Sequence, residues 1–564
     1  MRISLLMVLI FFTSLFNLVN AQGALVPLNS DYYYLIDRYE IKYGKFAPRI
    51  FTSYKQTQRK DIAAFADTVL QDSTLSKVDK FNLQYLKNDN WEWYADSLKV
   101  GNSKKPVLKY LYTKNNSFYS FRSKDFEIMI NPVINFEQNN INKEYPLSLN
   151  TRGVEIRGLI GKKVGFYTFL TDNQAFVPDY VRAEADSAAA FPGEGFTKTF
   201  KVKGVDSKGY DFFSARGYIT FNVIKQINVQ FGHDKNFIGN GYRSMLLSDY
   251  SAKYLYLKLT TKVWRFNYTN LFADMTGTVV NGNRYNPRRY MAMHHLSFNV
   301  TKNFNIGLFE AIMFHRSDSI TGNNGFELNY LNPIILYREV ESYLGSLDKT
   351  FVGLDFKWNF LKHFSMYGQF ALHEFRFKEL LAQKGNYTNK YVWQIGLKYV
   401  DVLGVKNLDF QLEHNFARPF AYAGGQVAGP IINFSNYGQP LAHPLGANFY
   451  EFIGIVRCQP YKRLSITGKM FYMVYGIDPS GKNFGSNIFN DYNTKDHVDG
   501  NEVAQGIKTT TTFISLNISY MLFHNFFIDL RQTIRNEKNE LATTNILLTT
   551  LGLRWNISQR LSEF

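Results

Sequence analysis

Cysteine is almost absent from this chain, which has Cys458 alone among its 564 residues. A single cysteine excludes an internal disulfide framework, so the fold must be stabilised by packing and hydrogen bonding. We expect the thiol to act as a small hydrophobic side chain and not as a reactive group.

Long apolar runs are also missing from most of the chain. After Ala21 no window of about 20 predominantly apolar residues occurs, which excludes a membrane-spanning helix there. The first 21 residues are different. Arg2 supplies a positive charge, residues 5–16 form an apolar stretch, and the small-residue site Val19-Asn20-Ala21 follows. This order predicts a signal peptide over residues 1–21 and an exported protein. The alternative, a retained membrane helix, is disfavoured because the apolar stretch is short.

Motifs for metal or cofactor chemistry are lacking as well. There is no His-Glu-x-x-His or paired-cysteine spacing in the sequence. The adjacent His294 and His295 point to opposite faces of a strand, so they cannot chelate one metal ion. We expect no cofactor and no catalysis, although the sequence leaves open a glycosidase-type carboxylate pair among 47 acidic residues.

Aromatic residues, by contrast, are abundant. The chain holds 50 Phe, 38 Tyr and 6 Trp, which make up 17% of its residues and exceed what one ordinary core needs. A transmembrane β-barrel uses aromatic residues both on its lipid-facing surface and in its interfacial girdles. The mean hydropathy of -0.25 agrees with a barrel, because every second strand residue faces a polar lumen.

Strict alternation of apolar and polar residues begins near residue 125. In residues 352–360 and 391–399 the alternation lasts for nine residues. That length suits a tilted strand that crosses a bilayer, whereas strands of a soluble sandwich average about 5 to 6 residues. The last alternation covers residues 547–557, and a final strand near a terminal aromatic, here Phe564, resembles the recognition signal of outer-membrane barrels.

These features predict an all-β transmembrane fold, an antiparallel outer-membrane β-barrel over residues 126–564. At roughly 24 residues for each strand with its share of the connections, the barrel should have about 18 strands, within a range of 16 to 20. The longer connections are expected on the extracellular side, at residues 172–209, 417–447 and 479–508. The predicted location is the cell outer membrane.

Residues 22–125 differ in kind, because their apolar period is helical. A helix over about residues 60–70 is expected from the spacing of Ile62, Phe65 and Val69. A second helix should begin near Ser76, since Ser76 and Asp79 have the spacing of a capping box. We therefore expect a small helical periplasmic segment that plugs the barrel.

Positive charge is in excess, with 64 Lys and Arg against 47 Asp and Glu and a formal net charge of +17. In an exported protein this favours anionic partners, either acidic surface polysaccharide or the phosphates of outer-membrane lipids and lipopolysaccharide, and disfavours nucleic acid. The excess is concentrated in residues 22–125, which hold 17 basic and 11 acidic residues. The charges expected to face the lumen nearly balance, and they are Arg265, Lys357, Lys398, Arg531, Arg554, Asp355, Asp409, Glu413 and Asp529.

The most distinctive segment runs from Gly232 to Leu259. Its glycines at 232, 239 and 241, followed by Ser244-Met245-Leu246-Leu247-Ser248, resemble the signature of the Wzi-type capsule-assembly family of outer-membrane barrels. The similarity is greater to the branch found in Bacteroidetes, which includes the gliding-motility protein RemB, and residues 329–333 and the Arg338-Glu339 pair add to it. Enteric members have a tryptophan-rich, proline-containing turn where this chain has Asn236-Phe237-Ile238 and Asn240, so substrate details are not carried over.

The resemblance implies an 18-stranded barrel that acts as a surface lectin and binds, attaches or organises capsular or exopolysaccharide. Candidate glycan-binding residues, chosen for stacking and hydrogen-bonding side chains, are Tyr242, Arg243, Asp249, Asn329, Tyr330 and Arg338. Without a ligand, residues 239–241 are a turn or bulge whose glycines admit positive φ, and Arg243 with Asp249 forms a lumen ion pair. Two other functions stay open: a component of a surface adhesion or gliding apparatus, with other surface proteins as partners, and, with less support, a diffusion channel.

Overall fold

The computed structural model describes residues 23–28, 30–94, 99–103, 107, 110–140, 147–202, 207–277, 287–316, 325–333, 336–344, 348–374, 376–425 and 431–564. The signal peptide predicted over residues 1–21 lies outside them. Among the described residues, none of the helices combines the length and the apolar character needed to span a membrane.

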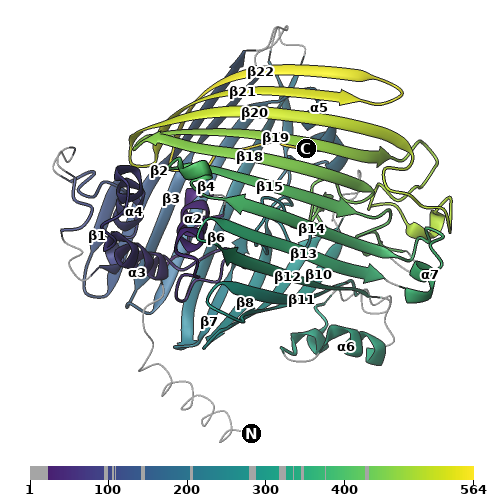
Figure 1. Ribbon diagram of the computed structural model, residues 1–564, viewed down its shortest axis with the longest axis horizontal. Coiled ribbons are helices and arrows are strands. Elements are labelled where there is room, and N and C mark those ends of the chain that lie inside the picture. The colour runs from purple at the N-terminus through teal and green to yellow at the C-terminus, as the bar shows by residue number, and fades with distance from the viewer. Residues whose placement is uncertain are drawn as a thin grey trace, which may run out of the picture.

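Eighteen strands in the described chain form one closed antiparallel barrel (Figure 1), as predicted. The barrel closes because β2 pairs with β3 on one edge and with the last strand, β22, on the other. The strands are β2 (Phe126–Asn140), β3 (Leu147–Ile160), β4 (Val164–Phe176), β6 (Lys208–Ile224), β7 (Ile227–Asp234), β8 (Tyr254–Val263), β9 (Phe266–Thr276), β10 (Arg288–Asn299), β11 (Phe304–Phe314), β12 (Lys349–Phe360), β13 (Phe364–Glu374), β14 (Lys390–Tyr399), β15 (Leu408–Ala417), β18 (Phe449–Tyr461), β19 (Leu464–Ile477), β20 (Ile507–Phe523), β21 (Phe526–Lys538) and β22 (Thr543–Trp555).

The two faces of the strands separate as the alternation predicts. On β12 the outward Leu354 and Trp358 are 42% and 44% exposed, whereas the inward Asp355 and Lys357 are each 1% exposed. Apolar residues that face outward from a closed barrel contact lipid, and the inward polar residues meet the packed lumen. One charge was assigned wrongly: Arg265 is exposed in the turn between β8 and β9 and not on the lumen face, because the strand alternation ends before it.

The two ends of the barrel differ in the length of their connections. One end, here called the short-turn end, has tight turns such as residues 161–163, 264–265 and 462–463. The opposite end, the long-loop end, has the connections 177–207, 418–448 and 478–506, which match the three long connections predicted from the sequence. Short elements within the connections are α5 (Asp179–Ala188), β5 (Lys198–Lys201), η3 (Leu328–Leu331), α6 (Tyr337–Leu344), α7 (Phe377–Leu381), η4 (Val402–Gly404), β16 (Ser435–Asn436), β17 (Gln439–Pro440) and η5 (Tyr492–Thr494).

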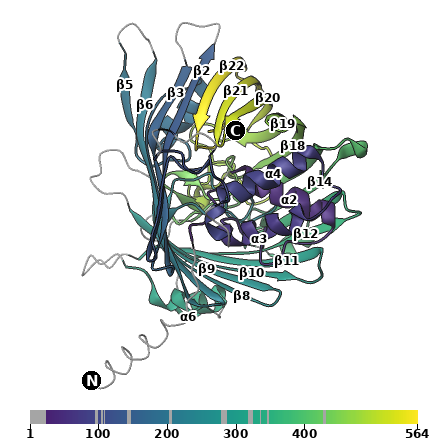
Figure 2. The ribbon, with the colours of Figure 1, turned by 90° about the vertical axis from the view of Figure 1, so that its left-hand side faces the viewer.

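Three helices gather at the short-turn end (Figure 2). They are α2 (Asp31–Tyr43), α3 (Arg59–Leu70) and α4 (Lys77–Asp89), followed by η2 (Trp91–Trp93). Helix α4 begins with the predicted capping box, in which the Asp79 amide donates to Ser76 Oγ over 2.9 Å. Tyr85 of α4 donates to Asn525, in the turn between β20 and β21, over 2.6 Å. The helices therefore contact the rim of the barrel through its turns.

Helix α2 carries the charges that fix this helical unit to the barrel wall. Arg38, only 2% exposed, forms ion pairs with both Asp401 and Asp409 near the turn between β14 and β15. On the same helix, Asp37 and Glu40 accept hydrogen bonds from Lys357 of β12 over 2.5 and 2.7 Å. A buried charge without a partner is very unfavourable, so these pairs set the position of α2.

The edge of β2 at the barrel seam is shared by two strands. The short β1 (Tyr119–Arg122) pairs with residues 127–130 of β2. The last strand, β22, pairs on the same edge with residues 134–140. The seam therefore joins the segment after the helices to the end of the barrel.

Candidate ligand-binding site

The connection between β7 and β8 (residues 235–253), here called the plug segment, turns into the lumen. Its Met245, Leu246 and Leu247 are at most 1% exposed and pack in one cluster with residues of the β15–β18 connection, including Tyr422. The Tyr422 hydroxyl donates to the Met245 carbonyl over 2.7 Å. The segment that resembles the Wzi signature is thus buried inside the barrel lumen, which explains its apolar Met-Leu-Leu run.

The glycines of the plug segment are required by close approach to the wall. Gly239 adopts a φ of +135°, which side chains rarely adopt. A Cβ on Gly241 would lie 2.5 Å from Gln394 Oε1 and 2.6 Å from Glu413 Oε2. Ser244 then stabilises the turn, because its Oγ accepts from the amide of Leu247 over 3.2 Å. The expectation of a glycine with positive φ in residues 239–241 is met at Gly239, whereas Gly241 is required by its close approach to the wall.

Residues 556–564, here called the C-terminal tail, also lie in the lumen. Strand β22 ends at Trp555, two residues before the end of the alternation in the sequence, and Phe564 lies nine residues beyond the strand. Phe564 packs edge-on against Tyr180 and Tyr250, with ring centroids 5.8 and 5.9 Å away. The polar alternation that reaches residue 557 gives no signal for this change of direction.

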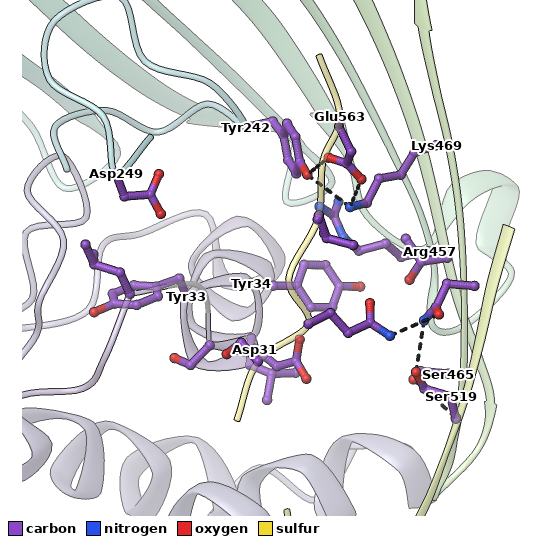
Figure 3. Close-up of a pocket in the computed structure, with 18 of the residues that line it drawn as sticks. Asp31, Tyr33, Tyr34, Tyr242, Asp249, Arg457, Ser465, Lys469, Ser519 and Glu563 are labelled. Carbon is purple, nitrogen blue, oxygen red and sulfur yellow. Dashed lines mark hydrogen bonds and ion pairs between the residues drawn. The ribbon is translucent and has the colours of Figure 1, made fainter. Parts of the chain in front are cut away.

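The plug segment, the tail and helix α2 enclose a cavity of about 630 Å³ against the wall of β18–β22. Figure 3 shows Tyr242, Glu563 and Lys469 joined at one side of this cavity, with Asp249 and Tyr33 on the other side. Its lining mixes tyrosine rings, cations and hydrogen-bonding groups, and the labelled members are Asp31, Tyr33, Tyr34, Tyr242, Asp249, Arg457, Ser465, Lys469, Ser519 and Glu563. Such a lining suits a polar ligand with flat faces, such as a sugar.

Glu563 of the tail is the centre of the charges in the cavity. Its carboxylate accepts hydrogen bonds from Tyr242 and from Lys469, the latter over 2.8 Å, and its carbonyl accepts one from Arg243. Arg243 also lies 3.6 Å from Glu451. The hydroxyl and the guanidinium that were predicted to bind a ligand are thus already bonded to the tail, and a ligand would have to displace it.

The bonding of Glu563 predicts a pH dependence. Burial raises the pKa of Glu563, but Lys469 and Arg243 beside it hold that pKa below its usual value. Because the pKa of Glu563 is lower in the folded state, its charge stabilises the attached tail. This stabilisation is complete above the ordinary glutamate pKa of about 4.3, and it is lost as the pH falls toward and through the pKa of Glu563 in the folded protein. Hydrogen exchange of residues 556–564, corrected for the intrinsic rate, should therefore be faster at pH 3 than at pH 7 by about tenfold or more. Exchange in a Glu563→Gln variant should already be fast at pH 7, and equal protection at both pH values in the unaltered protein would contradict the attachment.

The six predicted binding residues separate into two groups. Tyr242, Arg243 and Asp249 line the cavity together. The other three lie in the β11–β12 connection, on the outer side of the barrel, where fully buried Tyr330 packs against Phe314 in a cluster with residues of β9–β11. Asn329 donates to Glu327 over 2.8 Å, and Arg338 pairs with Glu341 over 2.8 Å. The structure therefore does not bring Asn329, Tyr330 and Arg338 to the cavity.

A group of tyrosines and lysines at the long-loop end was missed by sequence reasoning. Tyr387 and Tyr492, with ring centroids 6.2 Å apart, come from two different connections. Lys390 lies 3.7 Å from the centroid of Tyr492, Lys495 lies 4.2 Å from that of Tyr387, and Lys349 donates to the Tyr492 hydroxyl over 2.8 Å. We call these five residues the tyrosine–lysine cluster. The only sequence signal was that Tyr492 and Lys495 fall in a connection predicted to be long and extracellular.

In the described chain no three His, Cys, Asp or Glu residues are grouped so that they could hold a metal ion. His295 instead lies 2.7 Å from Asp355, and both are buried within the lumen. The predicted separation of His294 and His295 agrees with this, since His294 packs against Tyr337 on the outer side.

Comparison with known proteins identifies the fold. Wzi of Escherichia coli, described as an outer-membrane protein involved in group 1 capsule assembly and a carbohydrate-binding β-barrel, superposes with a TM-score of 0.56 at 12% identity, covering 96% of this chain and 100% of that one. Weaker likenesses, with TM-scores of 0.42 and 0.41 and 9% identity, are to OprD of Pseudomonas aeruginosa (76% of this chain, 94% of that one) and OccAB2 of Acinetobacter baumannii (77% and 99%). No family model and no curated protein matches the chain in sequence.

The chain therefore has a Wzi-like outer-membrane barrel fold, as the resemblance implied. This fold and the apolar outward surface place the protein in the outer membrane.

Proposed function

We propose that the protein is a non-catalytic outer-membrane barrel that binds acidic surface polysaccharide and attaches or organises it. The observation that carries this proposal is the tyrosine–lysine cluster at the long-loop end of a barrel whose lumen is filled. Tyrosine rings stack on sugar faces, and the partly exposed Lys349 and Lys495 attract the carboxylates of an acidic glycan. Lys390, by contrast, is buried and paired with Glu374. The carbohydrate binding described for Wzi is in line with this proposal.

The filled lumen argues against the diffusion channel. The plug segment and the β15–β18 connection form a cluster of fully buried apolar residues that includes Leu246, Leu247 and Phe420. A second region of the lumen is occupied by the tail, through the bonds of Glu563. A water-filled passage needs a continuous polar path, and these two blocks interrupt it in the part of the chain that is described.

The orientation of the barrel follows from its connections. Outer-membrane barrels have short turns in the periplasm and longer loops outside the cell. On that rule residues 22–125 form a periplasmic segment, residues 126–564 form the barrel, and the tyrosine–lysine cluster faces outward. Outer-membrane lipids and lipopolysaccharide would then surround the apolar belt.

The cluster can be tested by a double substitution, Tyr387→Ala with Lys495→Gln. Loss of one stacking ring and one cation should weaken binding of an acidic polysaccharide, with polygalacturonate as the probe, by about tenfold or more at low salt. Binding to immobilised polygalacturonate by the refolded protein measures this, and raising the salt concentration should reduce the difference.

Lys225→Gln is the matched control, because Lys225 is an exposed lysine in the turn between β6 and β7, at the opposite end of the barrel. It should leave binding unchanged. If the double variant and the control bind polygalacturonate as well as the unaltered protein does, the long-loop cluster is not the binding site.

The similarity of residues 232–259 to the branch containing RemB supports a second proposal, a part in a surface adhesion or gliding apparatus with other surface proteins. Deletion of the gene separates the two roles if capsule retention and surface motility are scored independently. Loss of motility with a normal capsule would favour the apparatus, and loss of capsule with normal motility would favour the polysaccharide role.

A further inference from the structure

The wall of the barrel has a step beside β7. Residues 217–222 and 224 of β6 pair with β7, which ends at Asp234, whereas β6 continues for nine residues beyond this pairing, from 216 back to Lys208. Further along the same edge, residues 208–211 pair with β5. In the described chain no strand pairs with residues 212–216 on this edge, a length of about 16 Å at 3.3 Å per residue.

A cavity of about 460 Å³ opens at this step. Its lining includes Phe213 and Ala215 of the open β6 edge, His233 of β7 below, and Ala252 and Tyr437 behind it. Tyr437 is fixed in place because its amide donates to the carbonyl of Thr276, at the end of β9, over 2.7 Å. We call this cavity the wall notch, since it interrupts the strand ladder and not the lumen.

The wall notch lies at the upper margin of the apolar belt. Strand β4 pairs with the other edge of β6. In this pairing Leu170 of β4 lies opposite Ala215, and Asp172 of β4 lies opposite Phe213. Asp172 forms an exposed ion pair with Arg152 over 3.3 Å on the outer surface. Exposed charges mark where the lipid-facing surface ends, so Phe213, which is 61% exposed, stands at the boundary between acyl chains and head groups.

A partition separates the wall notch from the lumen cavity. Glu194 and Lys253 line both cavities and form an ion pair with each other. Arg560 of the tail pairs with Glu194 over 2.8 Å, and its guanidinium lies 5.0 Å from the ring centroid of Phe212. Because Glu194 and Lys253 are largely buried and all three groups are paired, the notch has a closed polar back and an open apolar front.

An open strand edge on a lipid-facing wall is unfavourable, because its backbone amides and carbonyls have no water to bond in the hydrocarbon region. At the head-group boundary, the ester and phosphate oxygens of a lipid supply acceptors for such amides. The aromatic rings of Phe196 and Phe213, 66% and 61% exposed, flank the opening on the outer side. Charges at the notch balance, with Lys198 and Lys253 against Glu194 and Asp211, so it does not select a head group by charge.

We propose that the wall notch is a lipid-binding site that takes one acyl chain of an outer-leaflet lipid beyond the ends of β7 and β8, with its head group against the open edge of β6. This site is independent of the polysaccharide binding proposed above, because it lies in the wall and shares no residue with the tyrosine–lysine cluster.

Photolabelling tests the site directly. The unaltered protein in nanodiscs is irradiated with phosphatidylcholine that carries a diazirine at the end of one acyl chain, and labelled residues are mapped by mass spectrometry. Labels are expected on Ala252 and Tyr437, behind the wall, as well as on outward belt residues such as Ile219 and Phe231. Labels confined to the belt residues would overturn the proposal, and so would labelling of Ala252 and Tyr437 by a water-soluble diazirine but not by the lipid.

A variant pair supports the map. Ala215→Trp places a large ring at the mouth of the notch and should lower the labelling of Ala252 and Tyr437 by about fivefold or more. Thr168→Trp, on the outer face of the adjacent strand β4 and outside the notch lining, should leave it unchanged. A heat-modifiable gel mobility like that of the unaltered protein shows that each variant is folded, and undiminished labelling in a folded Ala215→Trp variant would contradict the site.

Discussion

Removal of residues 557–564 is expected to turn a silent barrel into one that conducts ions. The tail occupies the part of the lumen beside β18–β22, where Lys469 and Arg243 bond to Glu563 and Arg535 donates to the Phe564 carbonyl over 3.3 Å. Its loss joins the 630 Å³ cavity to the space that Phe564 now fills beside Tyr180. The plug segment and the β15–β18 connection would remain, so the expected path runs beside them, along the interior of β18–β22.

Single-channel recording in planar bilayers measures this effect. The full-length protein should show no conductance steps, whereas the truncated protein should show discrete steps, as expected for an open barrel lumen. Glu563→Gln, which removes one charge and keeps the tail, should give an intermediate frequency of brief openings. Silence of the folded truncated barrel would mean that the plug segment and the β15–β18 connection close the lumen without the tail.

Replacement of Lys357 by Met should release the helical unit from the barrel. Lys357 is 1% exposed and neutralises both Asp37 and Glu40 of α2, and removal of one partner from a buried ion pair costs about 3 to 5 kcal/mol. In the variant only Lys398 would still pair with Asp37, and Glu40 would keep the hydrogen bond from the Ala47 amide but lose its cation. Helix α2 would then detach more readily than the strands unfold.

Limited proteolysis can separate these two events. Cleavage within residues 30–94 should be faster in the Lys357→Met variant by about a hundredfold or more, as expected for a loss of about 3 kcal/mol. The barrel itself should keep its heat-modifiable gel mobility. Lys225→Met serves as the control, since Lys225 is exposed and distant from α2, and equal cleavage in both variants would show that this ion pair does not hold the helices.

The fold was largely predictable because its determinants are local. Alternation in residues 352–360 shows which side faces lipid, and the Ser76 capping box shows where α4 begins, each within a few residues of sequence. The number of strands followed from chain length. The segments that fill the lumen could not be predicted from the sequence. Their positions depend on contacts between residues far apart in the chain, such as Gly241 and Gln394.

The candidate site was predictable only in part for the same reason. Tyr242, Arg243 and Asp249 are close in sequence, and the structure keeps them in one cavity. Asn329, Tyr330 and Arg338 were added from a family resemblance, which gave no information on whether the two segments meet. The tyrosine–lysine cluster joins strand ends and two connections, so no single stretch of sequence contains its pattern.

The shared edge of β2 links events at the rim of the barrel to its closure. Residues 127–130 pair with β1, residues 134–140 pair with β22, and only residues 131–133 separate the two pairings. If the pairing of β1 with β2 extended by more than these three residues, the pairing of β22 with β2 would become shorter by the same amount, and the reverse also holds. A force or a binding partner that pulls on residues 110–125 would thus act directly on the junction at which the first and last strands meet.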